Sequence, residues 1–201
     1  VKNQADRLSR LVEDLLVIPD LEGSLRIFPD RVDMIQLILS CVASIQGKSE
    51  YAIQVDLPQD NYVEAWVDPD RMEQVLLNLL DNAVKYCSEE ALIRVSLTKE
   101  NNIARLSVFN SCELISEEQI SQLFQKFSRL DQRLTRTSRG TGLGLYITKG
   151  LVEAMGLKIR VYYQNGFYIE LLLPLLPKVP SVGHTTPASK ESVIPTQAGI
   201  S

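Results

Sequence analysis

The stretch DPDRMEQVLLNLLDNAVKY, residues 68–86, decides the fold because it carries the strongest helix signal in the chain. Asp68 is a good N-cap acceptor, and Pro69 suits the first helical position. Behind them, apolar residues recur every three or four positions and form one unbroken stripe: Met72, Val75, Leu76, Leu79, Leu80, Ala83 and Val84. This stripe predicts a helix packed across the core of a globular domain.

The same helix presents a second stripe on its opposite face, formed by Asn78, Asn82 and Lys85. Amide oxygens suit Mg²⁺ or its waters, whereas a lysine ammonium suits a phosphate. Any surface helix also has a polar face, and taken alone that reading is the simpler one. However, asparagine is a poor helix former, so two of them in one helix call for a reason.

Patterns on either side of this helix predict a mixed fold. Alternating residues around two turns, Asn101-Asn102 and Asn165-Gly166, predict two β-hairpins. The remaining patterns predict helices at 31–46, 116–123 and 142–155, and short strands at 25–28, 51–57 and 63–67. We therefore expect an α+β fold: a two-layer α/β sandwich with helices on one face of a single sheet, mixed but mostly antiparallel.

Composition narrows the class of protein. The 201 residues are 45% hydrophobic and 23% charged, which is typical of a globular chain. The net charge of −4 argues against a nucleic-acid partner, which would require a basic surface. No apolar run approaches the ~20 residues of a membrane span. Three widely spaced cysteines predict reduced thiols in a cytoplasmic setting, and the single histidine, His184, argues against a histidine-based catalytic triad.

The segment RGTGLGL, residues 139–145, contains three alternating glycines, Gly140, Gly142 and Gly144, just before a predicted helix. Glycines allow backbone N–H groups to approach a phosphate, and a helix N-terminus adds its positive end. The segment is neither a dinucleotide fingerprint nor a P-loop. A flexible loop followed by a helix start is an equally good account of these glycines alone. The preceding polar, basic stretch, 128–141, is predicted to be a mobile loop.

Taken together, NLLDNAVKY (78–86), LFQKF (123–127) and RGTGLGL (139–145) resemble, in order and spacing, the ATP-binding domain of sensor histidine kinases. That domain belongs to the superfamily that includes Hsp90-type chaperones, type II topoisomerase ATPases and MutL-type repair proteins, and its fold is of the Bergerat type. The resemblance divides the chain into three parts. Residues 1–22 resemble the end of a second dimerisation helix and its linker, residues 23–176 the ATP-binding domain, and residues 177–201 read as a disordered tail.

The resemblance implies roles for individual residues. Asn82 would coordinate Mg²⁺ on the nucleotide phosphates, with Asn78 in support. Lys85 and Arg129 would meet phosphate charge, although a solvated loop arginine is an equally good account of Arg129. Tyr86 would pack at the base and ribose. The segment Gly140, Thr141, Gly142, Leu143, Gly144 and Leu145 would cradle the phosphates at the end of an ATP lid that spans residues 128–141. Phe124 and Phe127 would hinge this lid by packing on the core, although plain core burial explains both equally well.

One motif departs from the family pattern. Where the family has approximately DxGxG after a strand, this chain has Asn110-Ser111-Cys112-Glu113-Leu114. Asn110 therefore replaces the acid that accepts the adenine amine, which predicts weaker ATP binding and poorer discrimination against GTP. Leu114 does not easily take a positive φ angle, so we expect this loop to follow a different path.

These observations predict an enzyme fragment, the catalytic domain of a two-component sensor histidine kinase. It would use ATP and Mg²⁺ to phosphorylate a histidine on a dimerisation domain, for relay to a response regulator. The parent would be a homodimer, cytoplasmic or membrane-anchored. One alternative is a degenerate nucleotide-binding or protein-interaction module of the same fold, without kinase activity. Another is a serine kinase of the anti-sigma type, which the LFQKF segment and the dimerisation-helix remnant disfavour.

Overall fold

The computed structural model describes residues 25–47, 49–59, 62–88, 92–128 and 141–176. The predicted dimerisation-helix remnant and the tail beyond residue 176 lie outside these ranges, as do Arg129, Gly140 and most of the predicted lid. No helix in the described part of the chain has both the length and the apolar character needed to cross a bilayer.

The predicted central helix is α3, Pro69–Tyr86. Asp68 caps it, since Oδ1 of Asp68 accepts a hydrogen bond from the Arg71 backbone N–H at 3.1 Å. The other carboxylate oxygen, Oδ2, accepts from the Phe28 N–H at 2.8 Å, so the side chain is used fully although it is buried. The apolar stripe is buried as expected, with the exception of Val84, which is half-buried.

A five-stranded sheet forms the second layer, with strand order β2-β4-β5-β7-β6. Both predicted hairpins are present: β4 (Ile93–Glu100) pairs with β5 (Ile103–Asn110), and β6 (Lys158–Tyr163) pairs with β7 (Phe167–Pro174). Their turns place Asn101 and Asn165 at positive φ. The edge strand β2 (Ile53–Asp56) runs parallel to β4, which makes the sheet mixed but mostly antiparallel.

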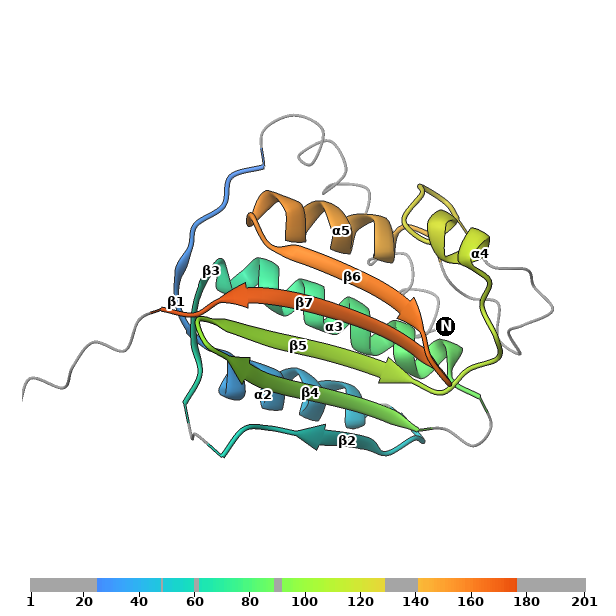
Figure 1. The fold of residues 1–201 in the computed structure, drawn as a ribbon, viewed down its shortest axis with the longest axis horizontal. Coiled ribbons are helices and arrows are strands. Elements are labelled where there is room, and N and C mark those ends of the chain that lie inside the picture. Colours follow the sequence, from blue (N-terminus) through green and yellow to red (C-terminus); the bar gives the residue numbers. More distant parts are fainter. Residues whose placement is uncertain (1–24, 48, 60–61, 89–91, 129–140, 177–201) are drawn as a thin grey trace, which may run out of the picture.

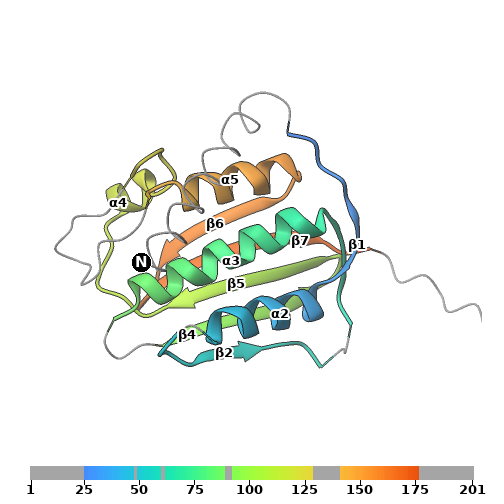
Figure 2. The same ribbon diagram turned by 180° about the vertical axis from the view of Figure 1, so that it is seen from behind.

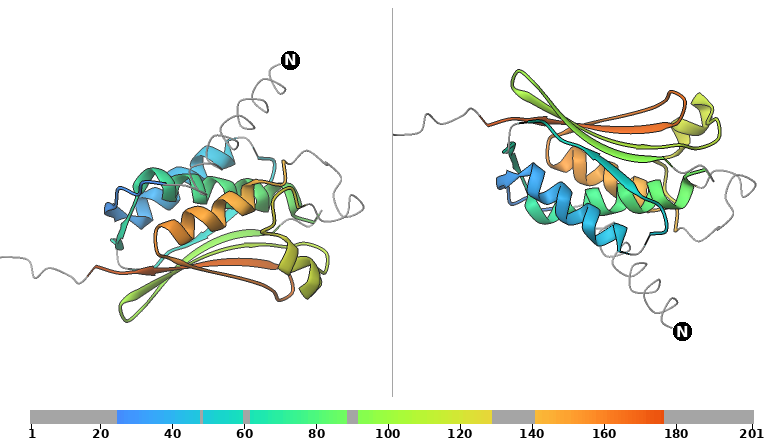
Figure 3. Two further views of the ribbon diagram at one scale, coloured as in Figure 1. Left: turned by 90° about the horizontal axis from the view of Figure 1, so that it is seen from above. Right: turned by 90° about the horizontal axis from the view of Figure 1, so that it is seen from below.

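The helices α2 (Met34–Gln46), α3 and α5 (Gly144–Ala154) cover one face of this sheet (Figures 2 and 3). The opposite face carries no helix in the described part of the chain, and we call it the open face (Figure 1). A short helix, α4 (Glu117–Gln122), lies at the end of the molecule where α5 begins, and it starts with a capping box formed by Ser116 and Gln119. The predicted two-layer sandwich is confirmed.

Two details of the expected fold are wrong. Residues 25–28 are not a strand; the strand β1 lies at Asp30–Asp33 and overlaps the start of the predicted helix 31–46, which begins only at Met34. The sheet is also not single, because β1 pairs with β3 (Glu64–Val67) in a separate two-stranded sheet. The physical reason is capping: Asp33 accepts a hydrogen bond from the Ile35 N–H and so begins the helix, which leaves the preceding residues extended.

Candidate functional site

The structure brings the polar stripe of α3 next to the start of α5. A Cβ atom placed on Gly144, the first residue of α5, would lie 3.7 Å from Nδ2 of Asn82. Two segments separated by about sixty residues of sequence thus meet at one place, as the phosphate-site interpretation requires. Because Gly144 carries no side chain, the space in front of Asn82 remains narrow but open on this side.

The N-terminus of α5 is built to receive an anion. Leu143 occupies the N-cap position, and no side chain caps the helix there. The backbone N–H of Leu143 itself donates to Oγ1 of Thr141 at 3.2 Å. A helix without a side-chain cap leaves N–H groups of its first turn available, and the positive end of its dipole adds to their attraction for phosphate. The side chain of Leu143 is buried and anchors this end to the core.

Gly142 fixes the loop that leads into α5. Its φ angle is +72°, and a Cβ atom there would lie 2.8 Å from the backbone carbon of Phe127 and 2.9 Å from the Ser128 carbonyl oxygen. The glycine-rich segment and the LFQKF segment are therefore in close backbone contact. Only glycine fits at this position, because both the backbone conformation and the neighbouring chain exclude a side chain.

The expected core packing of Phe127 is wrong. Its side chain is 65% exposed and its φ angle is +61°, so the backbone turns the ring outward where it passes Gly142. Phe124 is half-buried, and the ammonium of Lys149 on α5 lies 5.8 Å from the centre of its ring. A second such pair joins Lys126 to the ring of Tyr146, at 5.2 Å. These contacts between cations and aromatic rings tie the LFQKF segment to α5.

Lys85 is present on the expected face of α3, but its ammonium forms an ion pair with Asp81 one turn earlier. Both side chains are about one-third exposed, so the pair is open to solvent and of modest strength. The pair holds the ammonium at the last turn of α3, and a phosphate would compete with Asp81 for it. The i, i+4 spacing of Asp81 and Lys85 was a signal that the sequence analysis missed.

Asn78 lies one turn before Asn82, and its environment is different. The amide nitrogen Nδ2 of Asn78 is buried and has no hydrogen-bond partner among the described residues. A covered nitrogen argues against direct contact with a ligand from solution and favours a supporting role for Asn78. This agrees with the secondary role expected from the sequence, although the ligand set itself remains a proposal.

Asn110 ends β5 and lies beside the last residue of α3. Its Nδ2 donates to the carbonyl oxygens of Tyr86 and Ser111, both at 3.4 Å, and the residue is buried. With the amide nitrogen used inward, the amide oxygen is the group left for a base, and an acceptor suits the adenine amine. Tyr86 is 38% exposed at the same end of α3, so part of its side chain is accessible to a ligand.

The loop after Asn110 has no left-handed backbone at the two positions where the family pattern has glycine. The described residues with positive φ include neither Cys112 nor Leu114, and the Leu114 side chain projects into solvent. Hydrogen bonds from Ser88 and Leu92 to Ser111 tie the loop to the chain that follows α3. Burial raises the pKa of the half-buried Cys112 thiol to about 11, so this thiol is protonated and unreactive at neutral pH.

The donor chemistry fits Mg²⁺ only if the nucleotide supplies most of the ligands. The described residues contain no group of three His, Cys, Asp or Glu side chains that would hold a metal by themselves. The Asn82 amide is an oxygen ligand of the kind that Mg²⁺ accepts alongside water and substrate phosphates. The arrangement therefore suits a metal that arrives with a phosphate ester.

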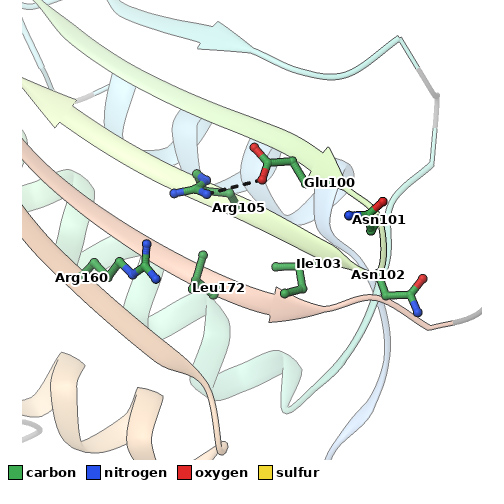
Figure 4. Close-up of a pocket in the computed structure, with 7 residues that line it drawn as sticks. All are labelled: Glu100, Asn101, Asn102, Ile103, Arg105, Arg160 and Leu172. Carbon is green, nitrogen blue, oxygen red and sulfur yellow. Dashed lines mark ion pairs between the residues drawn. The ribbon is translucent and has the colours of Figure 1, made fainter.

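A separate pocket lies on the open face of the sheet and contains none of the predicted site residues (Figure 4). It is formed by Glu100, Asn101, Asn102, Ile103, Arg105, Arg160 and Leu172, around the β4–β5 turn. Glu100 and Arg105 form an ion pair across it at 3.5 Å. Because these residues come from the face without helices, the pocket is distinct from the junction of α3 and α5.

Comparison with known proteins gives the class of this chain. Residues 67–177 match the family described as histidine kinase-, DNA gyrase B-, and HSP90-like ATPases. This match spans more than half of the chain, and the chain belongs to this family. ATP is the ligand that membership of this family implies.

Individual relatives are sensor kinases. Circadian input-output histidine kinase CikA of Synechococcus elongatus is 32% identical over 168 residues, 80% of this chain and 22% of that protein. Sensor protein GacS of Pseudomonas syringae pv. syringae is 30% identical over 186 residues, 87% and 20% of the two chains. The catalytic domain of histidine kinase ThkA superposes with a TM-score of 0.62 at 28% identity, covering 73% of this chain and 95% of that one.

The chain spans about one-fifth of the length of these two curated relatives. Over that length, its sequence and fold match the catalytic domains of two-component sensor histidine kinases.

Proposed function

We propose that this chain is the catalytic ATP-binding part of a two-component sensor histidine kinase. In this proposal it transfers the γ-phosphoryl group of ATP to a histidine on a dimerisation domain of the parent protein, for relay to a response regulator. The domain that does so would comprise residues 23–176. Neither the fold nor the comparisons favour the alternative of a module without kinase activity.

One observation carries the proposal: Asn82 lies against the first residue of a helix that has no side-chain cap. The Asn82 amide and a set of backbone N–H groups thereby border one small volume. These groups bind phosphate and the cation that accompanies it, and they offer little to an uncharged ligand.

Each residue then has a defined task. Asn82 would hold Mg²⁺, with Asn78 supporting it from the buried side, and the first turn of α5 would bind phosphate oxygens. Gly142 keeps the entering loop close to Phe127, and Lys85 would exchange its contact with Asp81 for phosphate. Mg²⁺, when bound, would neutralise charge on the phosphates. Asn110 would accept the adenine amine while Tyr86 packs at the base. Arg129 and Gly140 retain the roles expected from the resemblance.

The acceptor histidine must come from elsewhere. Residues 1–183 contain none, and the single histidine, His184, lies in the segment assigned to the tail. Transfer to a histidine on a separate dimerisation domain accounts for this composition. In the proposal, the parent is a homodimer and this part of it lies in the cytoplasm. No nucleic acid is required as a partner.

The first experiment is a calorimetric titration of the 201-residue protein with a non-hydrolysable ATP analogue, with and without Mg²⁺. We expect binding that depends on Mg²⁺, and we expect Asn82→Ala to weaken it by roughly a hundredfold. Asn102→Ala, which removes an amide from the pocket on the open face, is the matched control and should bind normally. Undiminished Mg²⁺-dependent affinity in Asn82→Ala would refute the assignment of this residue.

The second experiment tests the reaction. The protein is incubated with labelled ATP, alone and with the parent's dimerisation domain. We expect acid-labile phosphate on the dimerisation domain and none on this chain alone. Tight nucleotide binding without any transfer would instead support the degenerate module. Acid-stable label on a serine of this chain would support the serine-kinase alternative.

A further inference from the structure

Two buried polar atoms in the helical layer have no partner in the described part of the chain. One is Nδ2 of Asn78 on α3, and the other is Oγ1 of Thr148 on α5. Thr148 is 0% exposed. A threonine inside a helix commonly bonds back to the carbonyl four residues earlier, but this hydroxyl does not. Leaving a buried polar group without a partner destabilises a fold, so two such groups in one layer require an explanation.

The two atoms belong to the same helix–helix interface. Helices α3 and α5 pack against each other and run in opposite directions (Figures 1 and 2). Gly144 and Asn82 are close neighbours near the start of α5. Thr148 lies one turn after Gly144, and Asn78 lies one turn before Asn82. Because the helices are antiparallel, four residues back along α3 and four residues forward along α5 both lead about 6 Å in the same direction. Each step also stays on the same face of its helix.

Thr148 and Asn78 are therefore level with each other, one turn deeper than Gly144 and Asn82. They do not bond directly, since neither has a partner within hydrogen-bonding distance. A single water molecule would satisfy both, because it accepts from the Asn78 amide and also bonds to the Thr148 hydroxyl. Buried waters occupy sites of this kind, with two to four polar partners.

We propose that a buried water molecule bridges Asn78 and Thr148, and that Thr148 is thereby a positioning residue for Asn82. The bridge joins the two helices one turn behind the proposed phosphate site. It fixes how far the N-terminus of α5 lies from the amide of Asn82. Thr148 touches neither nucleotide nor metal and acts only through this register between α3 and α5. Its role in binding rests on the proposed function, whereas the water itself does not.

The stability of Thr148→Val distinguishes the bridge from an unpaired hydroxyl. Valine has the shape of threonine and lacks only the hydrogen-bonding group. If the bridge exists, the variant leaves the water and Asn78 short of a partner, and the folding equilibrium constant measured by urea denaturation should fall roughly fivefold or more. If the hydroxyl is simply unpaired in the native protein, its removal should leave stability unchanged or raise it, and that result would overturn the proposal.

A double-mutant cycle adds a second measurement. With Asn78→Ala as background, Thr148→Val should cost much less than it does in the parent protein, because the bridge is already broken. Equal costs in the two backgrounds would contradict the bridge. A high-resolution crystal structure of the nucleotide-free protein should show a water peak within hydrogen-bonding distance of both atoms. A direct hydrogen bond between the two side chains, or no water peak between them, would refute the bridge. This test does not depend on whether Asn78→Ala folds.

The positioning role is tested by nucleotide binding with and without Mg²⁺. We expect Thr148→Val to reduce the gain in affinity that Mg²⁺ provides by several-fold, and Thr148→Ser, which keeps the hydroxyl, to retain that gain. An equal loss with and without Mg²⁺, or a loss in Thr148→Ser as large as in Thr148→Val, would show a merely structural residue. If the parent protein binds no nucleotide at all, the proposed function fails, while the stability and density measurements still decide the water.

Discussion

Two regions of this molecule treat buried polar groups in opposite ways. On the open face, the buried Glu170 of β7 accepts a hydrogen bond from Arg105 at 3.0 Å and another from the Tyr162 hydroxyl at 3.0 Å. Both of its oxygens have partners within the protein. At the junction of α3 and α5, Nδ2 of Asn78 and Oγ1 of Thr148 have no partner among the described residues, and the N-terminus of α5 has no side-chain cap. The open face completes its own hydrogen bonds, whereas the junction leaves polar groups without a partner among the described residues.

The largest effect is expected at Gly142, where the junction depends on backbone conformation. Gly142→Ala would force a side chain into positive φ and against Phe127, at a cost of about 3 kcal/mol of unfolding free energy. We also expect the loss of nucleotide binding, because the loop must move. Urea denaturation and calorimetry measure the two effects.

Gly144→Ala is the matched control, because its methyl group would make only ordinary contact with Asn82. This variant should fold with normal or slightly raised stability, since alanine suits a helix, and should bind nucleotide more weakly. If both variants lose the same stability and the same nucleotide affinity, the two glycines do not differ in this way. Gly142 would then not be required for its positive φ, nor Gly144 only for the space beside Asn82.

The next effect in size concerns Asn110. Replacement by aspartate would turn a buried carboxylate toward the carbonyl oxygens that now accept from the amide, Tyr86 and Ser111. We expect a loss of about 2 kcal/mol at pH 8. The loss should be smaller at pH 5, because burial raises the pKa of such a carboxyl and a proton then neutralises it. Denaturation at both pH values measures this.

Asn101→Asp provides the comparison for that experiment. Asn101 occupies an exposed turn with positive φ, which aspartate also tolerates, so this variant should be nearly neutral at both pH values. A stable Asn110→Asp protein with improved ATP affinity would show instead that the amide contacts with Tyr86 and Ser111 are dispensable and that an acid serves the base better, as the sequence alone predicts.

On the open face, Glu170→Gln should lower stability by only about 1–2 kcal/mol, because Arg105 is partly exposed and retains Glu100. Nucleotide affinity should not change. Burial, together with the hydrogen bond to Glu170, raises the pKa of Tyr162 to about 12. Loss of the charge should lower that pKa, and an ultraviolet titration of tyrosinate measures it. Any weakening of nucleotide binding would show that the two regions are coupled.

The smallest effect is a loss of folding stability at alkaline pH, caused by ionisation of buried thiols. Burial raises the pKa of Cys41 and of Cys112 to about 11, from 9.0 for a free thiol. The folded protein keeps these thiols neutral, so their contribution to stability is complete below pH 9 and is lost as the pH rises towards 11. Denaturation between pH 8 and 10.5 should show this decline, and Cys41→Ala should flatten it. A decline that is the same in Cys41→Ala would point to other groups.

Much of this architecture could be predicted from local pattern. The cap at Asp68, the stripe of α3 and the two asparagine turns are short-range signals, and each produced the expected element. The pairing of β1 with β3 could not be predicted, because it joins segments about thirty residues apart and four-residue strands carry little periodicity. The sequence also placed the strand too early, since residues 25–28, three of them apolar, look more like a strand than DRVD does.

The same division holds for the candidate site. Asn78, Asn82 and Lys85 were found because a helix displays them at regular spacing. The outward turn of Phe127 depends on Gly142, fifteen residues later, and an exposed phenylalanine contradicts what hydrophobicity predicts. Thr148 gave no signal at all, since a threonine among apolar residues reads as part of the core. Only the packing of α3 against α5 reveals that the Thr148 hydroxyl has no partner in the described part of the chain.

The contact between Asp68 and Phe28 has a practical consequence for dissecting the protein. The carboxylate that caps α3 is buried, and half of its hydrogen bonding comes from a residue forty positions earlier. At the other end, Leu175 bridges to Ala65 of β3, and the Leu176 N–H donates to Glu64. A fragment cut to the family match, 67–177, would discard both attachments, and protease would digest it readily. Limited proteolysis should instead stop at a resistant core that retains both Phe28 and Leu176.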